Sequence, residues 1–109
     1  MDCVFCKIIK KDLPSEILYE NDKVVVFKDI NPRADFHFLI VPKKHIVSVN
    51  ELKEEEKELV GELFLTAKEV ARKYNLKGYK LLVNVGREGG QIIDHLHLHL
   101  LSGKIKESF

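Results

Sequence analysis

The sequence predicts an α+β fold in which an antiparallel β-sheet packs against one long helix. Several short apolar segments rich in β-branched residues are separated by turn signals, as expected of antiparallel strands. One longer segment instead carries apolar residues at spacings of three and four, which is the helical period. A chain of 109 residues can bury one modest core, so we expect residues 1–109 to form a single domain.

The first half of the chain predicts a short helical segment followed by three strands. Residues 1–13 are apolar and basic and are expected to form one or two helical turns. Asn21-Asp22 is a turn signal that joins the first two strands into a hairpin, and a loop containing Pro32 follows them. The predicted strands are residues 17–20, 23–28 and 36–41.

The second half predicts the long helix and two further strands. The helix is expected to run from Leu52 to Tyr74, with acidic residues in its first turns and basic residues at its end, as the helix dipole favours. Its apolar stripe consists of Leu59, Leu63, Ala67, Val70 and Tyr74, widened by Val60, Phe64 and Ala71. Residues 79–85 predict a fourth strand, and a glycine-rich loop at 86–91 precedes the last one.

That last segment, residues 95–99, is His-Leu-His-Leu-His. Alternation at period two predicts a strand with His95, His97 and His99 on one face and leucines on the other. Neighbours on one face lie roughly 6.5 Å apart, close enough for the imidazoles to act on one ligand. Imidazole serves as nucleophile, base or metal ligand near neutral pH, so we expect a functional site here.

Two chemistries are compatible with the three histidines. They could bind a catalytic metal ion, or one could attack phosphorus while the others orient and polarise the phosphate. The glycine-rich loop favours phosphate chemistry, because glycines let backbone N–H groups approach an anion closely. An ordinary flexible hairpin loop would explain the same glycines.

The overall composition points away from several classes of partner. The net charge is +1, with 45% hydrophobic and 32% charged residues, which gives no reason to expect a nucleic-acid or membrane partner. Met1 to Asp12 lack the apolar region of a signal peptide, so a cytoplasmic location is expected. In a reducing compartment, the spacing of Cys3 and Cys6 favours metal or redox chemistry over a structural disulfide.

Five sequence blocks occur in an order that carries a family resemblance. They are Phe27-Lys28-Asp29-Ile30-Asn31-Pro32, His37-Phe38-Leu39-Ile40-Val41-Pro42-Lys43-Lys44-His45, Val83-Asn84-Val85-Gly86, Gly89-Gly90-Gln91 and His95-Leu96-His97-Leu98-His99-Leu100-Leu101. Together they closely resemble the histidine-triad (HIT) family, most of all its HINT-type nucleotide-binding branch. The resemblance runs from Cys3 to about Ser102 and implies a HIT-like fold.

The resemblance also implies an activity and a set of site residues. It implies hydrolysis or nucleotidyl transfer at the α-phosphate of purine nucleotide conjugates, such as phosphoramidates that release AMP or GMP, without obligatory Mg²⁺. His97 matches the nucleophile that forms a nucleotidyl-histidine intermediate. The other implied catalytic residues are His99, His37, His95 and Gln91. The implied nucleotide contacts are Asp29 at the ribose, Ile30 and Phe5 near the base, and Asn84, Gly90, Gln91, His97 and His99 near the phosphate.

The same resemblance implies a zinc site and a dimer. Zinc-carrying members have an N-terminal cysteine pair, and the corresponding ligands here are Cys3, Cys6, His45 and His95. Such a Cys₂His₂ set suits a closed, structural, tetrahedral zinc, although a pair of buried free cysteines is the simpler alternative. Relatives are homodimers that pair the long helix and the strand at 79–85, which implies a homodimer here.

Four functions remain open at this stage. The first is an AMP- or GMP-releasing hydrolase of phosphoramidate-like or acyl-like conjugates. A dinucleoside polyphosphate hydrolase would have much the same loop and histidines, while Ile92 stands where many members carry a Ser or Thr expected to help the leaving group. A nucleotide-binding scaffold with incidental catalysis is the third, and a carbonic-anhydrase-like catalytic metal site is the fourth.

Overall fold

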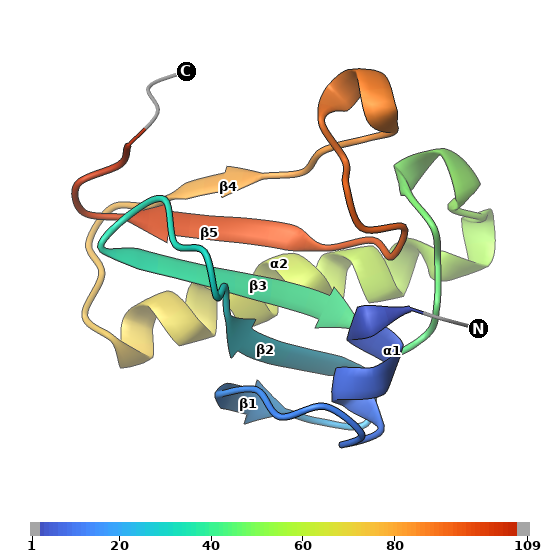
Figure 1. Ribbon diagram of the computed structural model, residues 1–109, viewed down its shortest axis with the longest axis horizontal. Helices are drawn as coiled ribbons and strands as arrows, with labels where there is room; N and C mark the ends of the chain where they lie inside the picture. The colour runs from blue at the N-terminus through green and yellow to red at the C-terminus, as the bar shows by residue number, and fades with distance from the viewer. Residues whose placement is uncertain (1–2, 107–109) are drawn as a thin grey trace.

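The computed structural model describes residues 3–106, so the first two and last three residues of the predicted domain lie outside the described range. Within that range the strands form one antiparallel sheet in the order β1-β2-β3-β5-β4, as Figure 1 shows. The strands are β1 (Ile17–Glu20), β2 (Val24–Lys28), β3 (Phe36–Pro42), β4 (Lys80–Leu82) and β5 (Leu98–Ser102). The helices are α1 (Val4–Ile9) and α2 (Lys57–Lys73), with short 3₁₀ turns at Val49–Glu51, Glu54–Glu56 and Arg87–Gly89.

The central strands of the sheet are buried on both faces, and the alternation of side chains along them divides the core into two clusters. One face packs against α2 and includes Val24 and Val26 of β2. The other packs against α1 and includes Val25 and Phe27 of the same strand. Because all four of these side chains are at most 1% exposed, β2 is a central strand with no solvated face.

The predicted hairpin, the third strand and the short N-terminal helix are confirmed. β1 and β2 pair antiparallel, and the Asn21 side-chain oxygen accepts hydrogen bonds from the backbone N–H groups of Lys23 and Val24, each at 2.8 Å. This is the local side-chain-to-backbone bonding that makes Asn a turn former. α1 begins after Cys3, whose sulfur accepts a hydrogen bond from the Cys6 backbone N–H at 3.4 Å.

The predicted start of the long helix at Leu52 is wrong, because α2 begins at Lys57. The Glu56 carboxylate folds back to accept the Lys53 backbone N–H at 2.8 Å and pairs with the Lys44 ammonium at 2.7 Å. These bonds favour a separate 3₁₀ turn at Glu54–Glu56 instead of a continuous α-helix that begins at Leu52. The predicted apolar stripe is otherwise correct, except that Phe64, which is 47% exposed, and the half-buried Val60 lie outside the core cluster.

The last two strands are shorter than predicted. β5 begins at Leu98, so His95 and His97 precede the strand. Ile46 lies in the connection after β3, and its carbonyl oxygen accepts the Leu96 backbone N–H at 2.6 Å. Because this N–H is bonded to the connection, residues 95–97 do not extend β5. The predicted strand at 79–85 shrinks to β4 (Lys80–Leu82), since its partner β5 ends its ladder at the Leu82–His99 pair.

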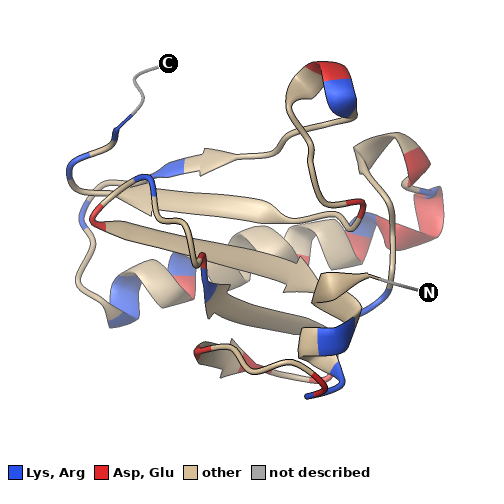
Figure 2. Ribbon diagram, viewed as in Figure 1, with Lys and Arg blue, Asp and Glu red and all other residues tan. Residues whose placement is uncertain are grey.

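Charged residues are spread over the described elements, with the acidic ones gathered most densely at the turns before α2 (Figure 2). β3 and β5 carry no Lys, Arg, Asp or Glu, in keeping with their central places in the sheet. No helix within residues 3–106 has the length and apolar character needed to cross a membrane.

Candidate active site and metal-binding cluster

A cavity of about 530 Å³ lies on the α1 side of the sheet. Most of its wall is apolar, and its polar groups include two of the triad histidines. Among the residues predicted from the sequence, those lining it are Phe5, Asp29, Ile30, Asn84, Gly90, His97 and His99. A mostly apolar hollow with a few convergent polar groups is typical of small-molecule sites.

His97 is held in one tautomer by the backbone. Its Nδ1–H donates to the carbonyl oxygen of His95 at 2.7 Å, so in the neutral ring the lone pair is on Nε2. The side chain is 8% exposed, and burial lowers the pKa of His97 below its usual 6.5. His97 is therefore neutral near pH 7, with a nucleophilic nitrogen at the cavity wall.

His37 and His99 form a directed pair beside it. The Arg33 backbone N–H donates to Nδ1 of His37 at 3.1 Å, which leaves the proton of the neutral ring on Nε2. That Nε2–H can donate to Nδ1 of His99, 2.9 Å away. His99 then carries its own proton on Nε2, the nitrogen available to a ligand. Arg33 was not among the residues predicted for the site, because it acts through a backbone group that any residue has.

Burial keeps these imidazoles uncharged. Desolvation lowers the pKa of His37, opposed by the nearby Asp29 carboxylate. Desolvation also lowers the pKa of His99 to about 4, and the neighbouring imidazoles His97 and His37 add to the effect. His37 and His99 can therefore keep the hydrogen bond between them at neutral pH, and neither ring carries a charge that would repel the other or His97.

Asp29, His37 and His99 also lie close enough together to be considered as metal ligands. The hydrogen-bond polarity argues against that use. A metal-binding imidazole normally donates its other N–H to an acceptor, whereas Nδ1 of His37 accepts from a backbone N–H. The ring nitrogen that faces Asp29, at 3.4 Å, is thus the protonated one and has no lone pair for a cation.

Gln91 does not line the cavity. Its side chain is 2% exposed, and its oxygen accepts the Gly86 backbone N–H at 2.9 Å. Its amide N–H₂ donates to the carbonyl oxygens of Val47, at 2.7 Å, and Ile93, at 3.0 Å. Gln91 therefore anchors the glycine-rich loop to the connection between β3 and α2.

An ion pair that the sequence did not reveal closes this loop. Arg87 makes two parallel hydrogen bonds to the carboxylate of Asp94, at 2.8 and 2.9 Å, and a third to the Gln91 carbonyl, at 2.6 Å. The two side chains are seven residues apart and only the turn geometry brings them together.

Gly90 has φ of 85°, a conformation that favours glycine, and a Cβ there would lie 3.3 Å from the Asn84 amide nitrogen.

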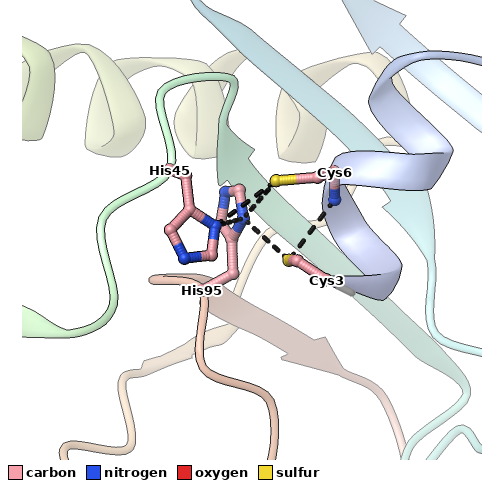
Figure 3. Close-up of side chains that lie close together, drawn as sticks. All are labelled: Cys3, Cys6, His45 and His95. Carbon is pink, nitrogen blue, oxygen red and sulfur yellow. Dashed lines mark hydrogen bonds between the residues drawn. The ribbon is translucent and has the colours of Figure 1, made fainter. Parts of the chain in front are cut away.

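The second group of predicted residues, which we call the metal-binding cluster, consists of Cys3, Cys6, His45 and His95. Figure 3 shows Cys3, at the N-cap of α1, and Cys6, within it, facing the two imidazoles. Sulfur and nitrogen lie 3.3 Å apart in both Cys3–His95 and Cys6–His45, and the two Nδ1 atoms are 3.1 Å apart. All four candidate ligand atoms lie within 4.8 Å of one another, so the cluster can hold a metal ion.

The donor set fits tetrahedral zinc. Usual zinc bond lengths would separate sulfur from nitrogen by about 3.5 Å and two nitrogens by about 3.3 Å, close to the distances in the cluster. The Nε2–H of His95 donates to the Pro42 carbonyl at 2.8 Å, which leaves the Nδ1 lone pair directed at the other ligands. Burial lowers the pKa of His95 to about 4, so the ring is in the neutral form that binds metals. His95 belongs to this cluster and does not line the cavity.

Comparison with known proteins identifies the family. The profile described as "Scavenger mRNA decapping enzyme C-term binding" matches residues 2–109. A HIT-like protein of Synechococcus elongatus is 41% identical over 104 residues, covering 94% of this chain and 91% of that protein. The chain belongs to the HIT family.

Two solved HIT structures resemble this chain closely. A HIT family hydrolase from Legionella pneumophila is 40% identical, covers 94% of each chain and superposes with a TM-score of 0.92. A histidine triad nucleotide-binding protein from Candida albicans is 33% identical, with a TM-score of 0.84 over 94% of this chain and 76% of that one. The predicted HIT fold is confirmed by these superpositions.

Proposed function

We propose that the protein is a hydrolase that cleaves purine nucleotide conjugates at the α-phosphate, with phosphoramidates of AMP or GMP as the representative substrates. The observation that supports it most is the neutral His97, held with its Nε2 lone pair at the wall of a cavity of nucleotide size. The Legionella pneumophila relative is named as a hydrolase and the Candida albicans relative as a nucleotide-binding protein, and both names support this proposal.

The first step of the proposed reaction forms a covalent intermediate. Nε2 of His97 attacks the α-phosphorus, and a nitrogen–phosphorus bond forms as the bond from phosphorus to the leaving group breaks. The leaving group departs with its electron pair and takes up a proton from water. The negative charge on phosphate oxygens is met by the Nε2–H of His99, which stays protonated, and by the loop around Gly90.

The second step returns the enzyme to its starting state. A water molecule attacks phosphorus, the nitrogen–phosphorus bond breaks and its electron pair returns to Nε2 of His97. The water proton passes to solvent, and AMP or GMP is released. Splitting one displacement into two easier ones is the benefit of a covalent intermediate.

The remaining cavity residues suit the rest of the nucleotide. Oδ1 of Asp29 accepts the Asn31 backbone N–H at 2.8 Å, and Oδ2 is the hydrogen-bond acceptor that we propose for the ribose hydroxyls. Phe5 and Ile30 supply apolar surface for a base, and Ile30 is 88% exposed at the rim. The side-chain amide of Asn84 donates to the Gly89 carbonyl at 2.8 Å and thereby holds the shape of the glycine-rich loop.

We also propose that the metal-binding cluster holds a structural zinc ion and that the protein is a homodimer. Zinc is supported by the convergence of two thiols and two imidazoles of the right polarity. The dimer is supported by two apolar side chains on the exposed side of α2, Phe64 at 47% and Leu65 at 60% exposed, and by the position of β4 at an edge of the sheet.

The covalent mechanism predicts that AMP release from an adenosine phosphoramidate falls by at least about a thousandfold in His97→Ala. The variant should still bind AMP, which serves as the check on its fold. Wild-type enzyme quenched with an alkaline denaturant, in which the phosphorus–nitrogen bond survives, should carry an adenylyl group by mass spectrometry, and the variant should not. If the wild type releases no AMP from this substrate but does so from a dinucleoside polyphosphate, the substrate class is wrong. Tight binding without turnover on either would favour the scaffold function.

The pH dependence of kcat/KM follows from the neutral state of the nucleophile. Because burial lowers the pKa of His97, the reactive form persists below pH 6.5, and activity should fall only at more acidic pH. Protonation of His99, whose pKa is about 4, should contribute to the loss of activity near that pH. A pH profile of AMP release measures this, with metal content checked at each pH. A half-maximal point above pH 6.5 would contradict the assignment.

The zinc proposal predicts about one zinc ion per chain in the purified protein by elemental analysis. Cys6→Ser should lose the metal and lower Tm by about 5 °C or more, while turnover per folded molecule falls much less. Lys7→Ser, an exposed change in the same helix, is the matched control and should keep both metal and Tm. Metal-free wild-type protein would refute the proposal.

The dimer proposal predicts a molecular mass of two chains in light scattering. Phe64→Glu should shift the mass toward one chain, since it places a charge on the apolar patch of α2. Lys73→Gln, at an exposed position on the opposite side of the same helix, changes the charge by the same one unit and is the control. A wild-type mass of one chain at high protein concentration would exclude the homodimer.

A further inference from the structure

One residue takes part in both the metal-binding cluster and the proposed active site. The imidazole of His95 lies in the cluster, with Nδ1 3.3 Å from the sulfur of Cys3. The carbonyl oxygen of the same residue accepts the Nδ1–H of His97 at 2.7 Å. His95 is fully buried, and its Nε2–H is fixed on the Pro42 carbonyl. A movement of the His95 side chain would therefore also move the His95 carbonyl oxygen, whose hydrogen bond orients the imidazole of His97.

The helix α1 provides a second connection between the two sites. Cys3, its N-cap, and Cys6 belong to the cluster, while Phe5 between them lines the cavity. The Phe5 ring makes edge contacts with both imidazoles, with centroids 5.8 Å from His95 and 5.1 Å from His97. A cation bound by the two thiols would fix the helix that carries this part of the wall.

We propose that a metal ion in the cluster controls the nucleotide affinity of the cavity, with Phe5 and the backbone of His95 as the positioning groups. This inference rests on the proposed nucleotide site, because AMP is its probe. A metal that only stabilised the fold would leave the affinity of a folded chain unchanged. A coupled metal must obey reciprocity, so AMP must strengthen metal binding by the same factor by which the metal strengthens AMP binding.

The first experiment measures both sides of this linkage. AMP affinity is measured by calorimetry on zinc-loaded protein and on chelator-treated protein whose circular dichroism matches it. Zinc affinity is measured against a competing chelator, with and without AMP. We expect metal removal to weaken AMP binding by about five- to tenfold, and AMP to tighten zinc binding by an equal factor. Equal AMP affinity in the two folded forms would overturn the coupling.

A second experiment covers the case in which the metal-free chain unfolds. Cadmium replaces zinc, and the cadmium NMR signal is followed as AMP is added, because that signal responds to small changes in ligand geometry. We expect AMP to shift the signal in the wild type and to shift it less in Phe5→Leu. Ile9→Val is the matched control, since Ile9 packs on the same core cluster without lining the cavity. A signal that stays fixed at saturating AMP would overturn the proposal.

The outcomes separate this inference from the proposed function. AMP release that depends on His97, together with no response of either site to the other's ligand, would refute the coupling and leave the hydrolase intact. Reciprocal binding effects without any AMP release would support the coupling and refute the hydrolase. A zinc-loaded chain that does not bind AMP would refute both.

Discussion

The division of side chains between the two faces of β5 is the constraint on which the rest of the structure depends. Leu98 and Leu100 are almost fully buried in the cluster that packs against α2. Their burial fixes the register and rotation of the strand, because a one-residue slip would turn every leucine to the opposite face. His99 is consequently held on the α1 side, and His97, the residue just before the strand, lies with it at the wall of the cavity.

Backbone groups then give each imidazole a defined proton arrangement. The carbonyl of Pro42 takes the Nε2–H of His95, the carbonyl of His95 takes the Nδ1–H of His97, and a backbone N–H occupies Nδ1 of His37. The same residue type thereby takes three proton arrangements, which suit the three roles that we propose: metal binding, nucleophilic attack and hydrogen-bond donation. His97, the proposed nucleophile, needs no charged partner to be neutral, because its neutrality comes from burial.

The sequence was most informative where its signal is periodic or chemically rare. Alternation in 95–99 predicted that the leucines and the histidines face opposite sides of the sheet, and the spacing within α2 predicted its apolar stripe. The four residues of the metal-binding cluster were implied by the family resemblance and not by their spacing. Element ends were harder to predict, because the start of α2 depends on the Glu56 carboxylate reaching back to a backbone N–H. The Arg87–Asp94 pair could not be predicted either, since two charged side chains seven residues apart meet only through the turn of the loop.

The two walls of the cavity are supported in different ways. The glycine-rich loop is held by hydrogen bonds within the chain, from the buried Gln91 amide and from Arg87, so its geometry is largely set by the fold. α1 has only six helical residues, and a helix of that length has little stability of its own. It depends on the packing of Phe5 and on its two cysteines. Of these walls, α1 is the one whose position a bound cation can determine, and its Phe5 touches the imidazole that we propose as nucleophile.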